Sequence, residues 1–339
     1  MATEQESQGA IRDSSRSGPY VTAVRWMENL SETAFAYFLL APALLLLLVI
    51  AIYPLLTTFG MSLFADAISG SASLGEFVGI QNYVELLTNQ KSYALPAPFL
   101  PTSLTVGGIV SSALGVTLIF TIVSVFFETI IGFAQALVLD QDFRGRRWIR
   151  VAIIIPWAVP IVIQGMIFFL LFQPGIGFLV GTSQNPSLLN QLGIIGTTPL
   201  VNTIDSLLII TVADVWKTTA FMALLILAGM QSIDRSLYDV ARVSGASPWQ
   251  QFKLITFPLI LPTIMVAMLF RTIAAMRVYG IIETTTGCQT VPSLSCLVVS
   301  SFSSRTYGTA ATVAFVTAAI IGVVVSIYIV KFADAEGGF

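Results

Sequence analysis

Histidine is absent from the 339-residue chain, and charged residues make up only 10% of it. The lack of histidine removes the commonest general base and the commonest metal ligand, and two cysteines without histidine cannot form an ordinary zinc site. A soluble domain carries about 25% charged residues. What the chain has instead is 55% hydrophobic residues and a mean hydropathy of +0.86. These values predict a multi-span membrane protein.

A nucleotide-binding loop is also missing. The only lysines are Lys91, Lys217, Lys253 and Lys331, and none follows a glycine, so the Gly-Lys-Ser/Thr of a Walker A sequence is absent. No nucleophile is paired with a base, so an intramembrane enzyme has no support. We therefore expect no catalytic residue, no metal and no cofactor bound by this chain, and ATP-driven work would need a separate ATPase subunit.

Long apolar runs set the domain organisation, because about 20 residues cross a bilayer. Residues 1–30 are polar, which predicts a disordered cytoplasmic tail, and residues 31–335 would form a transmembrane domain with a retained first span. The apolar run 104–139 is too long for one straight span, so we expect a helix at or above the outer interface ahead of residue 116. The six expected spans cover about 35–56, 116–139, 151–173, 203–229, 259–280 and 309–332.

Basic residues test this topology through the positive-inside rule. With the N-terminus inside, only Lys91 and Arg305 fall on the outer side, and three basic residues fall in or at the edge of spans. The remaining basic residues are cytoplasmic: Arg12, Arg16, Arg25, Arg144, Arg146, Arg147, Arg150, Arg235, Arg242, Lys253 and Lys331. The bias predicts both termini and the loop 230–258 in the cytoplasm.

The loop 230–258 carries helix start and stop signals. Ser236 precedes Asp239 by three residues, and Ser247 precedes Gln250 by three, which are both capping-box spacings. We therefore expect a short helix over about 237–244 and a second helix that begins after Ser247.

A corner is expected between these helices. Gly245 stands where a first helix must end and turn, and Pro248 stands at the first position of the next helix, where proline is well tolerated. Trp249 and Phe252 follow on neighbouring turns. A DNA-binding helix-turn-helix is disfavoured, because residues 234–253 hold three basic and two acidic residues, a net charge of +1. Binding to DNA phosphates requires far more positive charge. An ordinary cytoplasmic helical hairpin is the plainer alternative.

This loop resembles the EAA loop of permease subunits in ATP-binding-cassette (ABC) importers, which docks into a cleft of the ATPase subunit. The matching residues are Asp239-Val240-Ala241, Gly245 and Ile255-Thr256-Phe257-Pro258; Asp239, Val240 and Phe257 depart from the family's Glu, Ala and Leu but keep the chemical type. The resemblance implies an ATPase-coupling role for Asp239, Val240, Ala241, Arg242, Gly245, Ala246, Ser247, Trp249, Phe252, Ile255 and Pro258.

Two further segments resemble binding-protein-dependent sugar permeases of the maltose and glycerol-phosphate type. Asp214–Phe221 with Leu224–Ile233 is similar to the span before the loop in the first of the two permease subunits. Phe77–Leu87 is similar to a segment after the first span, with a plain amphipathic loop helix as the alternative. The resemblance implies a six-span, all-α type I importer permease of the plasma membrane that moves a sugar or related polyol. The implied partners are a second permease, two ATPase subunits that bind ATP and Mg, and an external binding protein.

Charged residues inside the spans are costly and usually face a bundle interior or a water-filled path. Glu128, Asp214, Lys217, Arg271 and Arg277 are expected there. Asp214 and Lys217 are three residues apart, so they either form an intrahelical ion pair or line the solute path. Aromatic residues at span ends either stack on a sugar or form the interfacial belt. The candidate solute-path residues are Asp214, Trp216, Lys217, Arg271 and Tyr279.

Two observations limit these assignments. The family pattern has acids or aromatics where this chain has Ala274, Met276 and Gly280, so no substrate contact is carried over there. Cys288 and Cys296 lie eight residues apart in an expected outer loop, where disulfides are permitted; we expect a bridge, with two free thiols as the alternative.

An independent secondary carrier or channel is the alternative function, disfavoured by the EAA-like loop and the lack of an evident inverted repeat.

Overall fold

The computed structural model of the protein describes residues 30–67, 74–91 and 95–336. Within these ranges the regular structure is helical apart from one two-stranded ribbon. The chain divides into two units, Met1–Thr58 and Phe59–Phe339. The tail expected over residues 1–30 lies outside the described residues, except for Leu30.

The first unit holds most of one long apolar helix. This helix consists of α2 (Glu32–Leu47), a π-helical turn η1 (Leu48–Ile52) and α3 (Tyr53–Ser62). The last residues of α3 belong to the second unit. Ser31 caps its N-terminus. Most of its apolar side chains are exposed, and its 31 residues are enough to cross a membrane.

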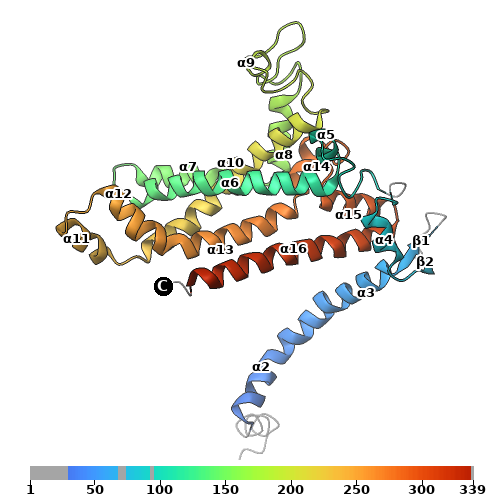
Figure 1. The fold of residues 1–339 in the computed structure, drawn as a ribbon, viewed down its shortest axis with the longest axis horizontal. Coiled ribbons are helices and arrows are strands. Elements are labelled where there is room, and N and C mark those ends of the chain that lie inside the picture. The colour runs from blue at the N-terminus through green and yellow to red at the C-terminus, as the bar shows by residue number, and fades with distance from the viewer. Residues whose placement is uncertain (1–29, 68–73, 92–94, 337–339) are drawn as a thin grey trace, which may run out of the picture. The chain divides into compact units, whose positions relative to one another are not determined.

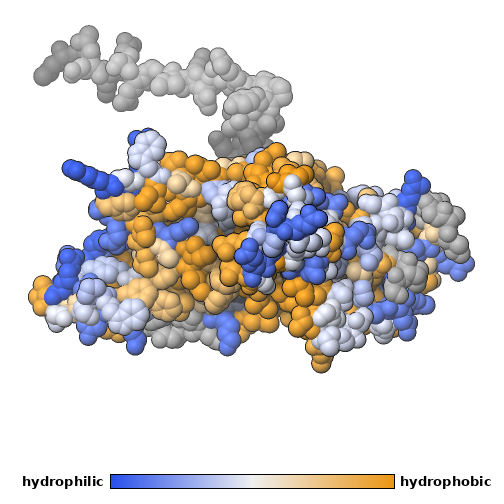
Figure 2. Space-filling view, turned by 90° about the horizontal axis from the view of Figure 1, so that it is seen from above, coloured by the Kyte–Doolittle hydropathy of each residue, from blue (hydrophilic) through white to orange (hydrophobic). Residues whose placement is uncertain are grey.

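Four long helices run side by side in the second unit (Figure 1). They are α6 (Ala113–Asp140), α10 (Thr203–Gln231), α13 (Phe257–Met276) and α16 (Tyr307–Glu336). α6 packs along α10, and α13 packs against α6, α10 and α16. Figure 2 shows apolar residues over much of the visible face, with hydrophilic residues at its two ends and in a patch near its middle. This distribution suits a bundle that crosses the hydrocarbon layer.

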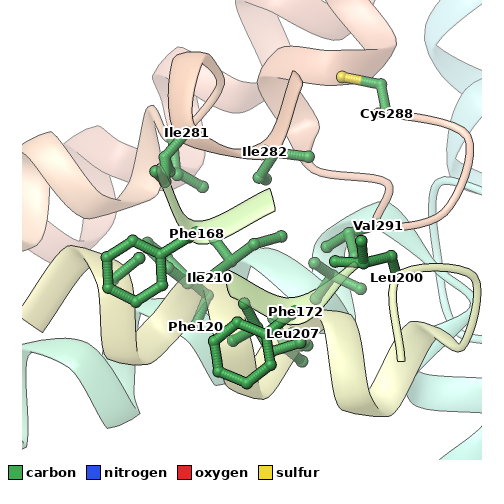
Figure 3. Packing of buried hydrophobic residues seen from close by; sticks show 14 of the residues in the cluster. Phe120, Phe168, Phe172, Leu200, Leu207, Ile210, Ile281, Ile282, Cys288 and Val291 are labelled. Atoms are coloured by element: carbon green, nitrogen blue, oxygen red, sulfur yellow. The ribbon is translucent and has the colours of Figure 1, made fainter. Parts of the chain in front are cut away.

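A buried apolar cluster lies where α6 and α10 meet the segments around α8 (Ile161–Phe172) and α14 (Gly280–Thr285) (Figure 3). It includes Phe120 from α6, Ile210 from α10 and Ile282 from α14, all fully buried. Close packing of these side chains holds the middle of the bundle together.

The expected third span is not a straight helix. α7 (Arg146–Ala158) and α8 are bent by 92° with respect to each other. Pro160 has no N–H with which to continue the helical ladder, and it disfavours helical backbone at the preceding Val159 (φ −67°, ψ 128°). Pro156, by contrast, is accommodated inside α7. Of the two prolines in this apolar run, only Pro160 therefore ends a helix.

Five helices of the described residues are long and apolar enough to cross a membrane, or six if α7 and α8 count as one broken span. α13 ends at Met276 rather than near residue 280, and α6 begins slightly before the expected residue 116. The connecting segments hold short elements, of which the sequence predicted the two helices of the loop 230–258 and a helix ahead of residue 116. Their elements are β1 (Phe64–Asp66), β2 (Leu74–Phe77), α4 (Gln81–Leu87), α5 (Val106–Val110), α9 (Leu188–Gln191), α11 (Arg235–Val243), α12 (Pro248–Gln251), the π-helical turn η2 (Phe252–Thr256) and α15 (Leu294–Ser303).

Candidate functional site

The loop between α10 and α13 folds into two short helices joined by a tight corner. α11 ends in a Schellman motif: the N–H of Ala246 donates to Ala241 O at 2.9 Å, and the N–H of Gly245 donates to Arg242 O at 3.0 Å. Gly245 has a φ of +81°, a left-handed conformation that favours glycine. The corner predicted from the sequence is present at the expected residues.

The cap of α11 differs from the sequence prediction. Asp234, not Ser236, is the N-cap residue, because its carboxylate accepts the N–H of Ser236 at 2.9 Å. This hydrogen bond lowers the pKa of Asp234 below its ordinary value. α12 has the expected capping box, in which Ser247 N–H donates to Gln250 Oε1 at 2.7 Å. The second helix therefore begins where predicted, and the first begins two residues earlier.

Three contacts fix the corner to the bundle. Arg235 pairs with Asp140 at the end of α6, with 3.0 Å between Nη2 and Oδ1. The hydroxyls of Tyr238 and Thr256 are 2.9 Å apart and join α11 to η2. The ring of Phe252 lies 5.8 Å from that of Phe133 on α6. α12, η2 and α13 form one continuous helical stretch, so a displacement of the corner passes directly into α13.

The corner exposes a set of large apolar side chains. Val240 is 66% exposed, Val243 is 91% exposed and Trp249 is 69% exposed, and Trp249 stacks on Phe252 with 5.3 Å between ring centroids. Exposed apolar surface of this kind marks an interaction site. Leu237 and Leu254 are exposed as well, and Leu254 carries no motif signal that would have identified it.

The predicted coupling residues divide between two environments. Some pack toward the bundle and are half-buried, while the others are exposed on the corner. The half-buried residues are Ala241, Ala246, Phe252, Ile255 and Pro258, and the exposed residues are Asp239, Val240, Arg242, Gly245, Ser247 and Trp249. Asp239 and Arg242 form an exposed ion pair at 2.8 Å, so each is already partnered on the surface that a docking protein would meet.

A buried charge cluster joins three of the long helices. Arg271 of α13 donates through Nε and Nη2 to the carboxylate of Glu128 on α6, and through Nη2 to Asp214 on α10. The side chains of Arg271 and Glu128 are 6% and 0% exposed. Thr218 Oγ1 donates to Glu128 Oε1 at 2.6 Å. The sequence placed these charges in the membrane, but no local spacing indicated that Glu128 meets Arg271.

The structure does not show the close intrahelical ion pair between Asp214 and Lys217 that was one of the two alternatives. Asp214 pairs with Arg271, and Lys217 Nζ donates to the backbone carbonyl of Val159, at the break between α7 and α8. Proline at position 160 leaves carbonyls near the break without helical donors. Lys217 thus satisfies a backbone group that would otherwise stand unpaired in a membrane-spanning segment.

The two predicted aromatic residues lie apart from this cluster. Trp216 is 41% exposed, and its ring centroid lies 5.9 Å from that of Phe168 on α8. Tyr279 is half-buried against the core of Figure 3, immediately before α14. Trp216 therefore remains accessible beside the broken helix, whereas Asp214 and Arg271 are occupied by each other and by Glu128.

The two cysteines lie beside an acidic residue. Cys288 and Cys296 are joined by a disulfide, with 5.5 Å between their Cα atoms, and Glu283 Oε2 accepts the backbone N–H of Cys288 at 3.2 Å. Among the described residues, no group of three or more His, Cys, Asp or Glu side chains is arranged to hold a metal ion.

Residues 128–335, more than half of the chain, match the family described as "Binding-protein-dependent transport system inner membrane component". The chain belongs to this family. It is the permease subunit of an ABC importer, a transport protein rather than an enzyme, with its ATPase on a separate subunit.

Two relatives are similar to this permease over most of their length. The trehalose/maltose transport system permease protein MalF of Thermococcus litoralis is 34% identical over 289 residues, which cover 84% of this chain and 89% of the relative. The trehalose transport system permease protein SugA of Mycobacterium tuberculosis is 32% identical over 259 residues, which cover 76% of this chain and 75% of the relative.

A solved structure confirms the predicted fold class. A bacterial ABC transporter involved in the import of the acidic polysaccharide alginate superposes with a TM-score of 0.68 at 19% identity, covering 91% of this permease and 99% of that chain. The fold is that of a type I importer permease, embedded in a membrane as a multi-pass protein.

Proposed function

We propose that this permease imports a sugar or related polyol that an external binding protein delivers. The proposal draws on the two relatives, whose names specify trehalose or maltose transport, and on the family's dependence on binding proteins. A second permease subunit would complete the pathway, and two ATPase subunits would bind ATP and Mg. Both termini of this chain would be cytoplasmic, as the distribution of basic residues favours.

One observation carries the mechanism: an exposed apolar corner is continuous with a membrane helix. Val240, Val243 and Trp249 would enter a groove of the ATPase, and burial of their apolar surface would supply affinity. Asp239 and Arg242 at the edge would set the register through polar contacts. Closure of the ATPase dimer would then push the corner and tilt α10 and α13, to which it is joined at both ends.

The predicted solute-path residues would take two different roles. Trp216 and Tyr279 would contact the solute, because aromatic faces stack well on sugar rings, and Lys217 would hold the broken helix beside them. Asp214 and Arg271 would hold the bundle together, because their polar atoms are directed at each other and at Glu128.

Purification with the co-transcribed partner subunits tests this function. A solute screen in proteoliposomes should find that a sugar-loaded binding protein stimulates ATP hydrolysis and that the sugar accumulates inside. Cysteines introduced near Ser187 should react with an impermeant reagent from outside, and those near Arg146 should not. Stimulation by amino acids or ions but not by any sugar would refute the proposed substrate class, and the reverse labelling pattern would refute the orientation.

A further inference from the structure

The segment Phe77–Leu87, which the coupling function does not use, has two faces of different chemistry. Its inner face is polar and fixed. Asn82 is 2% exposed, and its Nδ2 donates to Ser62 O and to Phe64 O, at 2.8 Å in both cases. The hydroxyls of Tyr83 and Ser62 are 2.6 Å apart. This face therefore holds the end of α3 and the start of the ribbon against α4.

A buried ion cluster ties the same segment to α16. Lys91 Nζ lies 3.8 Å from Asp66 Oδ2 and 3.7 Å from Glu85 Oε2, and it donates to Thr309 Oγ1 at 3.1 Å. The N–H of Thr309 donates in turn to Asp66 Oδ1 at 3.0 Å. Because the partners come from β1, α4 and the first turn of α16, the segment is held in a defined position at that end of the bundle. Figure 1 shows that this end lies opposite α11 and α12.

The outer face is apolar and uncovered. Phe77, Ile80, Val84 and Leu87, the apolar stripe, are 67%, 72%, 52% and 49% exposed. Ile80, Val84 and Leu87 follow a helical spacing of four and three residues, which puts them on one side of α4, and Phe77 stands at the end of β2 just ahead of them. Lys91 is the only basic residue between 59 and 91, and it is buried. The stripe is therefore suited to apolar contact and has no exposed cation with which to bind an anionic ligand.

The stripe continues onto a membrane-spanning helix. Leu87 and Tyr83 form one wall of an apolar groove of about 440 Å³, and Phe315, Ile320 and Val323 of α16 form the other. At 1.5 Å per residue, Val323 lies about 24 Å along the helix from its first residue, Tyr307. A groove that reaches so far along a span lies in the hydrocarbon layer, which a water-soluble partner does not enter.

We propose that the segment is an interfacial membrane anchor. The apolar stripe rests in the leaflet opposite the loop that contains α11 and α12, and the groove between α4 and α16 holds one acyl chain of a phospholipid. The inner hydrogen bonds transmit this anchoring to the ends of α3 and α16. Because no exposed cation lies on the stripe, retention of the lipid depends on its acyl chain and not on an anionic headgroup. The inference requires only that the chain spans a membrane, so it is independent of the solute.

Fluorescence quenching in lipid nanodiscs tests the anchor on the assembled transporter. Phe77→Cys and Ile80→Cys are labelled with bimane, and Glu76→Cys is the matched control, because neighbouring residues of a strand point to opposite faces. The unsubstituted chain serves as the labelling blank. Lipid that carries a quencher near the headgroup should reduce the signal at positions 77 and 80, and aqueous iodide should reduce it at position 76.

Two results would overturn the anchor. Iodide quenching at 77 and 80 as strong as at 76 would mean that the stripe faces water. Protection of 77 and 80 from both quenchers would mean that another protein subunit covers it.

Native mass spectrometry tests the groove separately. Val324→Trp fills it and should remove one retained phospholipid, while Ala318→Trp, at an exposed position of α16 outside the groove, should not. Equal phospholipid retention by both variants, or selective retention of anionic lipid, would contradict the proposal.

Discussion

Replacement of Arg271 with glutamine should destabilise the bundle severely. The guanidinium is the cation between two carboxylates, on Glu128 and Asp214, whose side chains are 0% and 13% exposed. Glutamine can still donate a hydrogen bond, but it leaves Glu128 buried without its countercharge, and Asp214 then keeps only its interaction with Lys217. Removal of one partner from a buried ion pair costs about 3–5 kcal/mol, because the remaining charge is uncompensated.

A compensated variant separates this effect from loss of shape. In Glu128→Gln/Asp214→Asn/Arg271→Gln, all three groups are neutral and can still hydrogen-bond, so most of the lost stability should return. Arg277→Gln is the matched control, because Arg277 is exposed and surface substitutions usually change stability by about 0.5 kcal/mol or less.

Unfolding of the purified chain in mixed micelles, titrated with a denaturing detergent, measures these differences directly. The expected order of stability is wild type and Arg277→Gln first, then the triple variant, then Arg271→Gln. If Arg271→Gln matched Arg277→Gln, or if the triple variant were no more stable than Arg271→Gln, the charge cluster would not hold the helices together as described.

The remaining predictions concern three separate features. Lys217→Met should lower solute uptake without lowering co-purification of the partner subunits, because Lys217 caps a carbonyl at the helix break; unchanged uptake would refute a role in the path. Gly245→Ala should weaken association with the ATPase through a backbone cost of about 1–2 kcal/mol, whereas Gly245→Asn should weaken it less. A Cβ at this position meets no atom within 4 Å, so equal weakening by the two variants would argue against backbone strain. Cys288→Ser/Cys296→Ser should lose about 2–3 kcal/mol of stability, and non-reduced peptide mapping of the wild type should find the pair joined; two free thiols would refute the bridge.

Local signals in the sequence predicted the corner well. Gly245 and the pair Ser247 and Gln250 act over a few residues, so their spacing alone specifies a turn and a cap. The first cap was misassigned because Asp234 and Ser236 are both capable residues, and only the folded backbone decides which one accepts a hydrogen bond. Hydropathy likewise located the long helices, because the bilayer thickness imposes their length.

Contacts between distant segments could not be predicted in this way. Glu128 and Arg271 are 143 residues apart, and each alone indicated only a costly buried charge. Pro156 and Pro160 look equivalent in an apolar run, yet only Pro160 stands at the end of a helix. The break there is tolerated because Lys217, from another helix, donates a hydrogen bond to a carbonyl that the break leaves free. The apolar stripe beside α4 was equally hidden, because its exposure depends on which face of the segment meets α16.

Docking of the α11–α12 corner on the ATPase is tested most directly by ATP-driven uptake by Val240→Glu. Val240 is exposed, so a carboxylate there should not disturb the fold, but it would be buried on docking without a partner. Gln231→Glu adds a carboxylate at the end of α10 and is the control. Val240→Glu should insert normally but lose the ATPase or its coupling to uptake, while Gln231→Glu should transport normally. Full ATP-driven uptake by Val240→Glu would contradict this docking.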